Sequence, residues 1–346
     1  MMKSTSAWLL SAMRVYDRWL PRLLQLIRYV CLDVKSGKAS SEVGMGVQFS
    51  DDSSSMLDDS GGYLNWGFAE NRNATTPRPD WLTVIAVAVV AHAAASVVHE
   101  GLGHGGACLL AGCRPQLLTT MQFQGDERTV SRAAIKFIAA GGTLANLAAA
   151  TIAVGLLRRR RERANAGAFF LWLFATINLL QATGYLMYSG VSNIGDWAAV
   201  VRGLTPFWIW HGGLFLLGAS TYWLATRWAM GQLGRRLRSS GAARVAEANR
   251  YTLSAYAVGG LLSLAAGLFE PGGALIVLIA GVAASLGGTS GLAWGPQLLH
   301  DPRVGEPAEP ALRVTRDWRW IVAGAVVAAV FVFVLGHGVT LEAHRP

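Results

Sequence analysis

The chain has 346 residues, of which 52% are hydrophobic and only 15% are charged, and its net charge is +9. A soluble protein of this length carries about 25% charged residues, so the composition excludes an ordinary soluble domain. Long apolar runs alternate with short arginine-rich ones, which is typical of a chain that crosses a membrane several times. Because the arginines stand beside apolar segments, we expect them to contact lipid headgroups rather than nucleic acid. The three cysteines are too few for a disulfide framework.

Residues 1–80 form a separate N-terminal region in this interpretation. The stretch 7–30 mixes apolar residues with arginines and is too charged to span a bilayer, which favours an amphipathic helix at the membrane surface. A presequence, or a start codon assigned too early, is the alternative. The Ser-, Asp- and Gly-rich chain that follows predicts disorder.

Seven apolar segments follow, and a hydrocarbon core needs roughly 20 helical residues to cross it. The sequence therefore predicts an all-α polytopic membrane protein with about seven transmembrane helices. We place these helices at about 81–112, 133–157, 167–190, 207–228, 251–269, 273–295 and 319–340. Arginine-rich loops after the second and fourth spans predict a cytoplasmic position for both, with the N-terminus inside and the end of the first span near the outer face.

The end of the first span reads "SVVHEGLGHGG", with His99 and His104 five residues apart and Glu100 directly after the first histidine. In a regular helix, residues five apart diverge by about 140°, too far to bind one metal ion. A π-bulge brings them into line, and Gly101 and Gly103 lower the steric barrier to it. The pair is therefore a candidate zinc site, in which Glu100 is placed to take a proton from water. The alternative is a polar contact between helices, with His104 capping a helix end.

Other possible metal ligands, two cysteines and a further histidine, lie near this pair in the sequence. His104, Cys108 and Cys113 could form a rival metal set, but it lacks an adjacent base, and free cysteines are more often small buried hydrophobes. His92 is about 10 Å along the helix from His99, so we expect it to be packed or hydrogen-bonded rather than a ligand.

A third ligand is needed, and Asp196 in "YSGVSNIGDWAAV" is the best candidate. The first and third spans run in the same direction, so the end of the third lies on the same membrane side as His104. The alternative is an aspartate that caps the helix beginning at Trp197. Asn193 could orient a ligand or bind a substrate backbone. In the second span, "AAGGTLANLAAA" favours close helix packing, and Asn146 needs a polar partner there, either a neighbouring helix or a group of the active site.

This succession of a histidine–glutamate helix, "GGTLAN" and an asparagine-bearing span leading into a loop aspartate resembles the site-2 protease family of intramembrane zinc metallopeptidases. That family reads H-E-x-x-H, then A-G-P-x-A-N, then Asp-Gly after prolines. The resemblance covers about residues 81–205 and implies a three-helix metallopeptidase core, with the remaining helices in 206–346. The site that it implies comprises the zinc ligands His99, His104 and Asp196, the catalytic base Glu100, and Gly142 and Asn146 in the second motif. This chain departs from the pattern by one extra residue between the histidines, by Thr143 in place of proline and by Trp197 in place of glycine.

The expected function is that of a zinc metalloprotease in the bacterial inner membrane, which hydrolyses a membrane-protein substrate helix with a zinc-activated water. The connection 113–132 could supply an extended segment for strand-like pairing with an unwound substrate. A catalytically inactive scaffold or transport accessory is the alternative. A transporter is disfavoured because the later spans offer few buried charges, with His211 and Glu270 near span ends, and no inverted repeat.

Overall fold

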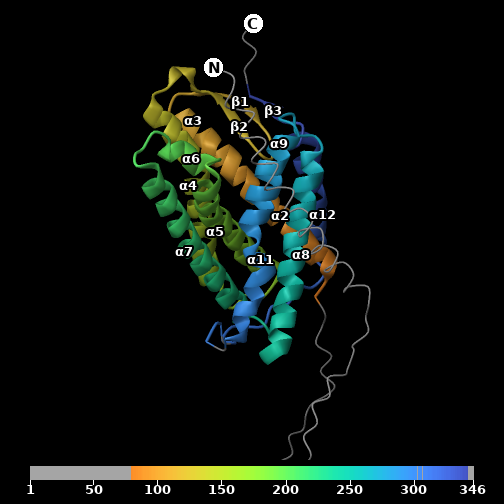
Figure 1. Cartoon of the computed structure of the whole chain (residues 1–346). Coiled ribbons are helices and arrows are strands. Elements are labelled where there is room, and N and C mark those ends of the chain that lie inside the picture. Colours follow the sequence, from red (N-terminus) through yellow and green to blue (C-terminus); the bar gives the residue numbers. More distant parts are fainter. Residues whose placement is uncertain (1–78, 302, 306, 342–346) are drawn as a thin grey trace, which may run out of the picture. The chain divides into compact units, whose positions relative to one another are not determined.

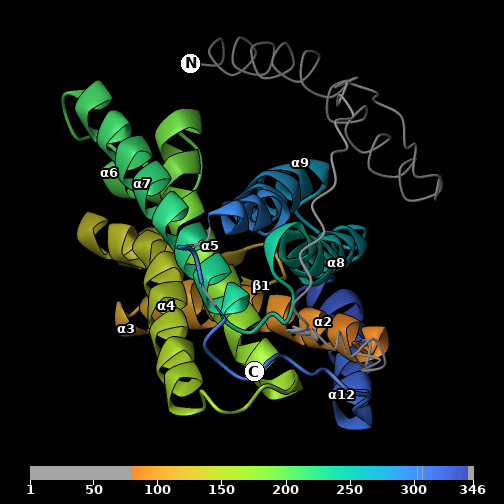
Figure 2. The same cartoon turned by 90° about the horizontal axis from the view of Figure 1, so that it is seen from below.

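The computed structural model describes residues 79–341 except 302 and 306. The amphipathic helix expected at 7–30, and the disordered stretch expected after it, lie outside the described residues. The described part of the chain is one compact unit, built mostly from long helices that stand side by side (Figures 1 and 2).

Long helical segments occupy all seven places where apolar runs predict them. They are α2 (Trp81–Val97) continued by η1 (Val98–Gly105) and α3 (Gly106–Leu110); α4 (Arg132–Arg159); α5 (Ala166–Ser192); α7 (Phe207–Gly234); α8 (Gly241–Gly267); a composite helix of α9 (Ala274–Ile276), η3 (Val277–Leu286), α10 (Gly287–Thr289), α11 (Gly291–Trp294) and η4 (Gly295–His300); and α12 (Trp318–Ala329) with η5 (Val330–Leu335). Two short helices, η2 (Glu127–Thr129) and α6 (Asp196–Val201), lie in the connections.

Within the described residues, five of these segments are long and apolar enough to cross a membrane, which is the make-up of an integral membrane protein. The other two long helices, α7 and α8, are not among the five. The number of seven transmembrane helices therefore stays a prediction.

Polar residues placed just before the apolar runs start the helices. Asp80, Ser131 and Asn165 cap α2, α4 and α5, each through a side-chain oxygen that accepts from the backbone amide three residues on, at 3.0–3.2 Å. Such a cap contributes about 1 kcal/mol to helix stability. The sequence thus sets where each of these helices begins.

Helix α5 is the central element of the fold. It packs against α2, α4 and α7, and 78% of its apolar window is buried, against 11% for the window that contains α12. Phe169, Trp172 and Leu180 from α5 are among the largest fully buried side chains. Helix α5 lies in the expected metallopeptidase core, 81–205, and α7 lies in the expected C-terminal region, 206–346. Because α5 packs against α7, these two regions are packed against each other.

A small antiparallel sheet departs from the expected all-helical fold. It consists of β1 (Arg114–Leu118), β2 (Phe123–Asp126) and β3 (Val339–Thr340), in the order β2-β1-β3, so that β2 is an edge strand (Figure 1). The hairpin β1–β2 arises in the connection 113–132, where the sequence predicts an extended segment. The register shifts between Pro115 and Leu117, as a β-bulge does.

The tip of this hairpin is inserted into the helical body. Thr119, Thr120 and Met121 are all buried, and the Ser96 hydroxyl of α2 donates to the Thr120 carbonyl at 2.6 Å. Non-helical backbone at membrane depth is tolerated where protein covers it or where it lines a hydrated cavity. The tip therefore belongs to the interior rather than to a surface loop.

Cys108 and Cys113 form a disulfide between α3 and the start of β1. The rival metal set of His104 with these two cysteines is therefore wrong, because both sulfurs are bonded to each other.

We predict that Gly190→Ala destabilises the protein by about 1–3 kcal/mol, because a Cβ at this position of α5 would lie 2.7 Å from the backbone nitrogen of Phe215 in α7. Thermal unfolding in detergent checks this. The control is Gly212→Ala on α7, where a Cβ meets nothing within 4 Å. Equal melting temperatures for the two variants would contradict the close α5–α7 contact.

Candidate metal centre

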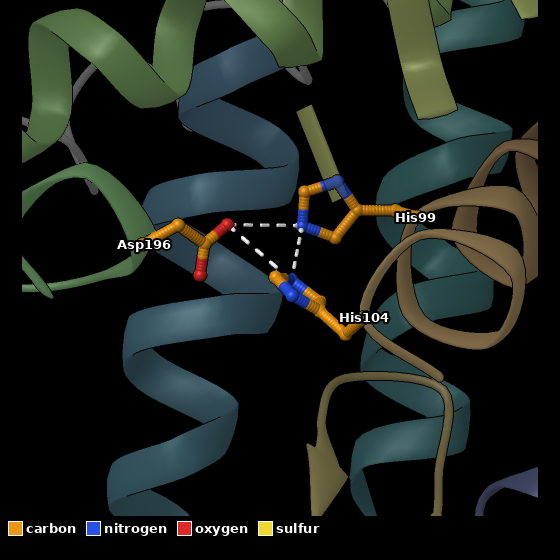
Figure 3. A group of neighbouring side chains, drawn as sticks. All are labelled: His99, His104 and Asp196. Atoms are coloured by element: carbon orange, nitrogen blue, oxygen red, sulfur yellow. Dashed lines mark hydrogen bonds and ion pairs between the residues drawn. The ribbon is translucent and has the colours of Figure 1, made fainter. Parts of the chain in front are cut away.

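A π-helical turn brings the two histidines together. Residues Val98–Gly105 form the π-helix η1, as the five-residue spacing predicts. His99 and His104 are 4% and 8% exposed, and their Nε2 atoms lie 3.3 Å apart (Figure 3). The wider turn therefore aligns two imidazoles that a regular α-helix would direct to different faces.

Asp196 completes a triangle with these imidazoles. Its Oδ2 lies 3.3 Å from His99 Nε2 and 3.4 Å from His104 Nε2 (Figure 3). The aspartate is the first residue of α6, and the chain reaches it through two residues with positive φ, Asn193 and Gly195. The topological expectation that the end of the third span returns to the histidines is therefore met.

The three donor atoms have the arrangement of a metal site. They lie within 4.8 Å of one another, and Asp196 Oδ2 is buried with the two imidazole Nε2 atoms as its neighbours. Burial alone would raise the pKa of Asp196, but hydrogen bonds and charge interactions with His104 and His99 outweigh it and lower this pKa below its usual range. Two imidazoles and an anionic carboxyl whose donor atoms converge on one point suit a cation, which would take the place of the imidazole protons.

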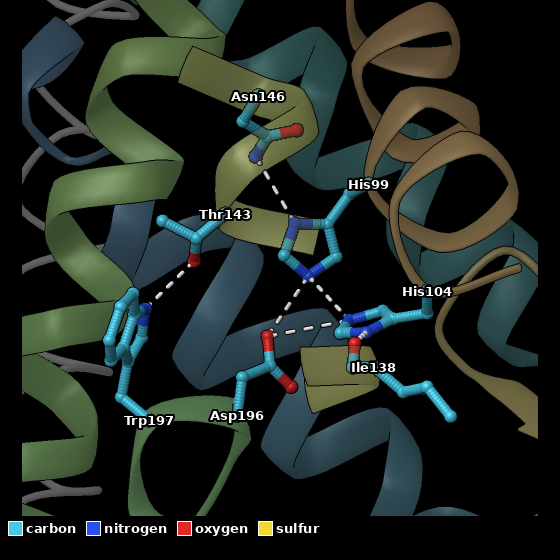
Figure 4. Close-up of polar contacts among 7 residues, drawn as sticks. All are labelled: His99, His104, Ile138, Thr143, Asn146, Asp196 and Trp197. Carbon is cyan, nitrogen blue, oxygen red and sulfur yellow. Dashed lines mark hydrogen bonds and ion pairs between the residues drawn. The ribbon is translucent and has the colours of Figure 1, made fainter. Parts of the chain in front are cut away.

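Groups on α4 contact the Nδ1 atom of each imidazole and orient both rings (Figure 4). His104 Nδ1 lies 2.8 Å from the Ile138 carbonyl oxygen, so Nδ1 donates its proton there, and the neutral ring has its lone pair on Nε2. The Asn146 amide lies 3.2 Å from His99 Nδ1. The atom of Asn146 that faces the ring is Nδ2, and Oδ1 is buried without a partner among the described residues. A metal-bound His99 would carry its proton on Nδ1, so the amide would turn by about 180° to accept that proton through Oδ1. Asn146, the polar residue in the apolar second span, therefore has its polar partner in the candidate metal centre.

Glycine is required where α4 passes the histidines. A Cβ at Gly142 would lie 2.6 Å from Nε2 of both His99 and His104. Gly103 of η1 faces the same stretch of α4, and a Cβ there would lie 2.5 Å from the Cα of Gly142. The pair of glycines in "GGTLAN" thus lets a helix pass directly against the donor triangle.

Two departures from the site-2 protease pattern contact each other. The indole Nε1–H of Trp197 donates to Thr143 Oγ1 at 2.9 Å (Figure 4). Thr143 stands where the family has proline, and Trp197 stands where it has glycine. Their hydrogen bond connects α6 to α4 and fixes the loop that carries Asp196.

Glu100 lies beside the triangle at the floor of a cleft. Its side chain is buried, and it lines a cleft of about 330 Å³ together with His104 and Asp196. Phe123 and Gly125 of the edge strand β2 form another wall of this cleft.

Sequence reasoning misses Tyr185 of α5. Its ring stacks on the His99 imidazole, with centroids 4.8 Å apart and an angle of 28° between the planes, and it lines the cleft. The signal is weak in the sequence, because tyrosines are common near the ends of membrane helices.

Other predicted residues lie away from the donor triangle. Asn193 is exposed and is not part of the cleft lining, so its role is to end α5 in a left-handed conformation. His92 Nε2 lies 3.1 Å from the Ala255 carbonyl oxygen, which confirms a hydrogen-bonded histidine. His211 stacks on Phe207. Glu270 accepts from Gln122 Nε2 at 2.7 Å and ties the hairpin to the loop after α8.

Comparison with known proteins gives no relative: no protein-family model matches the sequence, and no match was found among curated proteins or solved structures. The interpretation of this site therefore depends on its geometry.

We predict that Gly142→Ala abolishes metal binding at the triangle, because the added methyl group would displace both imidazoles. Metal content after purification, measured with the melting temperature, checks this. Gly155→Ala is the matched control on the same helix, since a Cβ there meets nothing within 4 Å. Full metal content in Gly142→Ala would argue against the triangle as the binding site.

We predict that Thr143→Val and Trp197→Phe each weaken metal binding by up to roughly 10-fold, because the hydrogen bond that holds the loop carrying Asp196 contributes about 0.5–1.5 kcal/mol. The double variant should lose no more than either single one, because all three lack the same hydrogen bond. Chelator competition measures these affinities. If the fold-losses of metal affinity in the two single variants multiply in the double variant, the two side chains act separately.

Proposed function

We propose that this chain is an intramembrane zinc metalloprotease of the site-2 protease type. The observation that supports it most directly is the size of the donor triangle. Its sides of 3.3, 3.3 and 3.4 Å are close to the spacing of about 3.3–3.4 Å between ligands of a tetrahedral zinc ion with bonds of 2.0–2.1 Å. Two histidines and an aspartate fit zinc chemically, and three protein ligands leave a fourth position for water or substrate, as in catalytic sites.

Different residues of the chain carry the separate steps of hydrolysis. A zinc ion held by His99, His104 and Asp196 would supply Lewis-acid chemistry that makes water nucleophilic near neutral pH. Glu100, buried beside the triangle, accepts a proton from the attacking water and delivers it to the leaving amine. The Ile138 carbonyl keeps His104 in the tautomer that this requires, and Asn146 would do the same for His99 with its amide oxygen toward Nδ1.

The cleft suits a substrate segment that has left its helical form. A helical peptide has its carbonyls already paired, so it must unwind before cleavage. The edge strand β2 borders the cleft and carries no strand partner on its outer side within the described residues. An unwound substrate can therefore add to β2 as a further strand, with one of its peptide bonds beside Glu100.

We further propose that α7 and α8 also cross the bilayer, which gives seven spans in a bacterial inner membrane. Each is long enough, since the 28 residues of α7 extend over about 42 Å. The arginine-rich loop after α4 and the hairpin before α4 lie at opposite ends of this helix. Arginine-rich loops favour the cytoplasmic side, which leaves the hairpin on the other side. The disulfide at the other end favours an oxidising compartment, so the cleft faces outward.

We predict that Glu100→Gln keeps its metal and loses at least about 100-fold in cleavage rate, because only the proton acceptor is removed. His104→Ala should lose both metal and cleavage. Metal analysis of the purified proteins, and quantitative proteomics of membrane proteins that accumulate uncleaved in Glu100→Gln cells, provide the two measurements.

The same experiment separates a protease from an inactive scaffold. With a scaffold, wild-type and Glu100→Gln cells would accumulate the same membrane proteins. Absence of metal from the wild-type protein, purified in the presence of zinc, would exclude the metalloprotease and leave the scaffold.

A further inference from the structure

A polar chamber adjoins the cleft at Glu100. Its volume is about 40 Å³, and it is enclosed by α2, the hairpin tip, α5, α8, η3 and η5. Besides His99, Glu100 and Tyr185, its polar lining consists of His92, Ser96, Thr120, Gln181, Ser263 and Ser285. The chamber meets the cleft at Glu100, Met121, Tyr185 and Ala280, which line both.

Part of this hydrogen-bonding capacity is not used by the protein. Thr120 Oγ1 and Gln181 Oε1 are buried without a partner among the described residues, and both side chains are more than nine-tenths buried. An unpaired buried polar group costs about 1–3 kcal/mol, and more in a bilayer, where no bulk solvent is near. Two such groups in one chamber point to a polar occupant.

The size and charge of the chamber indicate which occupant it takes. A buried water needs about 10–15 Å³ of such space and two to four polar partners, so the chamber has room for about three waters. Its lining carries no formal charge other than that of Glu100, which disfavours an anion, and its neutral hydroxyl and amide groups suit water.

We propose that this chamber is a water-binding site that supplies the water consumed beside Glu100. The supply role rests on the proposed proteolysis. Each hydrolysis joins a water oxygen to the carbonyl carbon and breaks the C–N bond, while the proton taken by Glu100 passes to the leaving nitrogen. A substrate segment along β2 would cover the cleft, whereas the chamber also borders Glu100 and is lined by no residue of β2.

X-ray hydroxyl-radical labelling tests the water site, because radicals form from bound water and oxidise the side chains beside it. In the wild-type protein in detergent, Phe331, which lines the chamber but not the cleft, should be oxidised, and Phe169, which lies in the dry core, should not. Thr120→Val combined with Gln181→Leu should lower Phe331 oxidation several-fold. Thr151→Val, an exposed threonine on α4, should leave it unchanged. Equal oxidation of Phe331 in the wild type and the double variant would overturn the proposal.

Kinetics with a cleaved substrate tests the supply role. The double variant should keep its metal and its KM while kcat falls about tenfold, as loss of a hydrogen-bonded partner of the reacting water would cause. A raised KM at unchanged kcat would instead assign the chamber to a substrate side chain. If the wild type cleaves nothing while the labelling result holds, the protease proposal fails and the water site stands.

Discussion

The close passage of η1 over α4 is the constraint on which the candidate centre depends. Gly103 and Gly142 approach so closely that neither position has room for a side chain. The wide π-turn by itself aligns His99 with His104, but only a helix at this distance can supply a carbonyl to one ring and an amide to the other. Backbone geometry therefore sets the position of the imidazoles, and side-chain hydrogen bonds set their protonation.

Much of this arrangement could be predicted because its causes are local or follow from topology. Apolar runs and capping residues locate the helices, the histidine spacing requires a π-turn, and span direction brings Asp196 back to the histidines. The hairpin was visible only as an extended polar connection, since its pairing partners lie elsewhere in the chain. The stacking of Tyr185 on His99, and the exposed position of Asn193, depend on the angle at which α5 crosses η1, and no single-sequence pattern encodes that angle.

The fold separates a dry side from a polar side of the same bundle. Around the central helix α5, Phe169, Trp172 and Leu180 join a continuous apolar cluster. Around the histidines, by contrast, the interior is built from the hairpin tip and from polar side chains on several helices. Polar groups inside a bundle of apolar helices are costly to bury, so their concentration around Glu100 marks this part of the molecule as the candidate functional region.

The hydrogen bond between Trp197 and Thr143 has a consequence for recognising other chains built in this way. Proline and glycine at these positions would restrict or free the backbone, whereas an indole and a hydroxyl hold α6 and α4 together by direct contact and so anchor the acidic residue beside them. A pattern that requires proline and glycine at these places passes over such a chain. One that accepts a donor–acceptor pair at the two positions, with a five-residue histidine spacing, would collect sequences that share this solution.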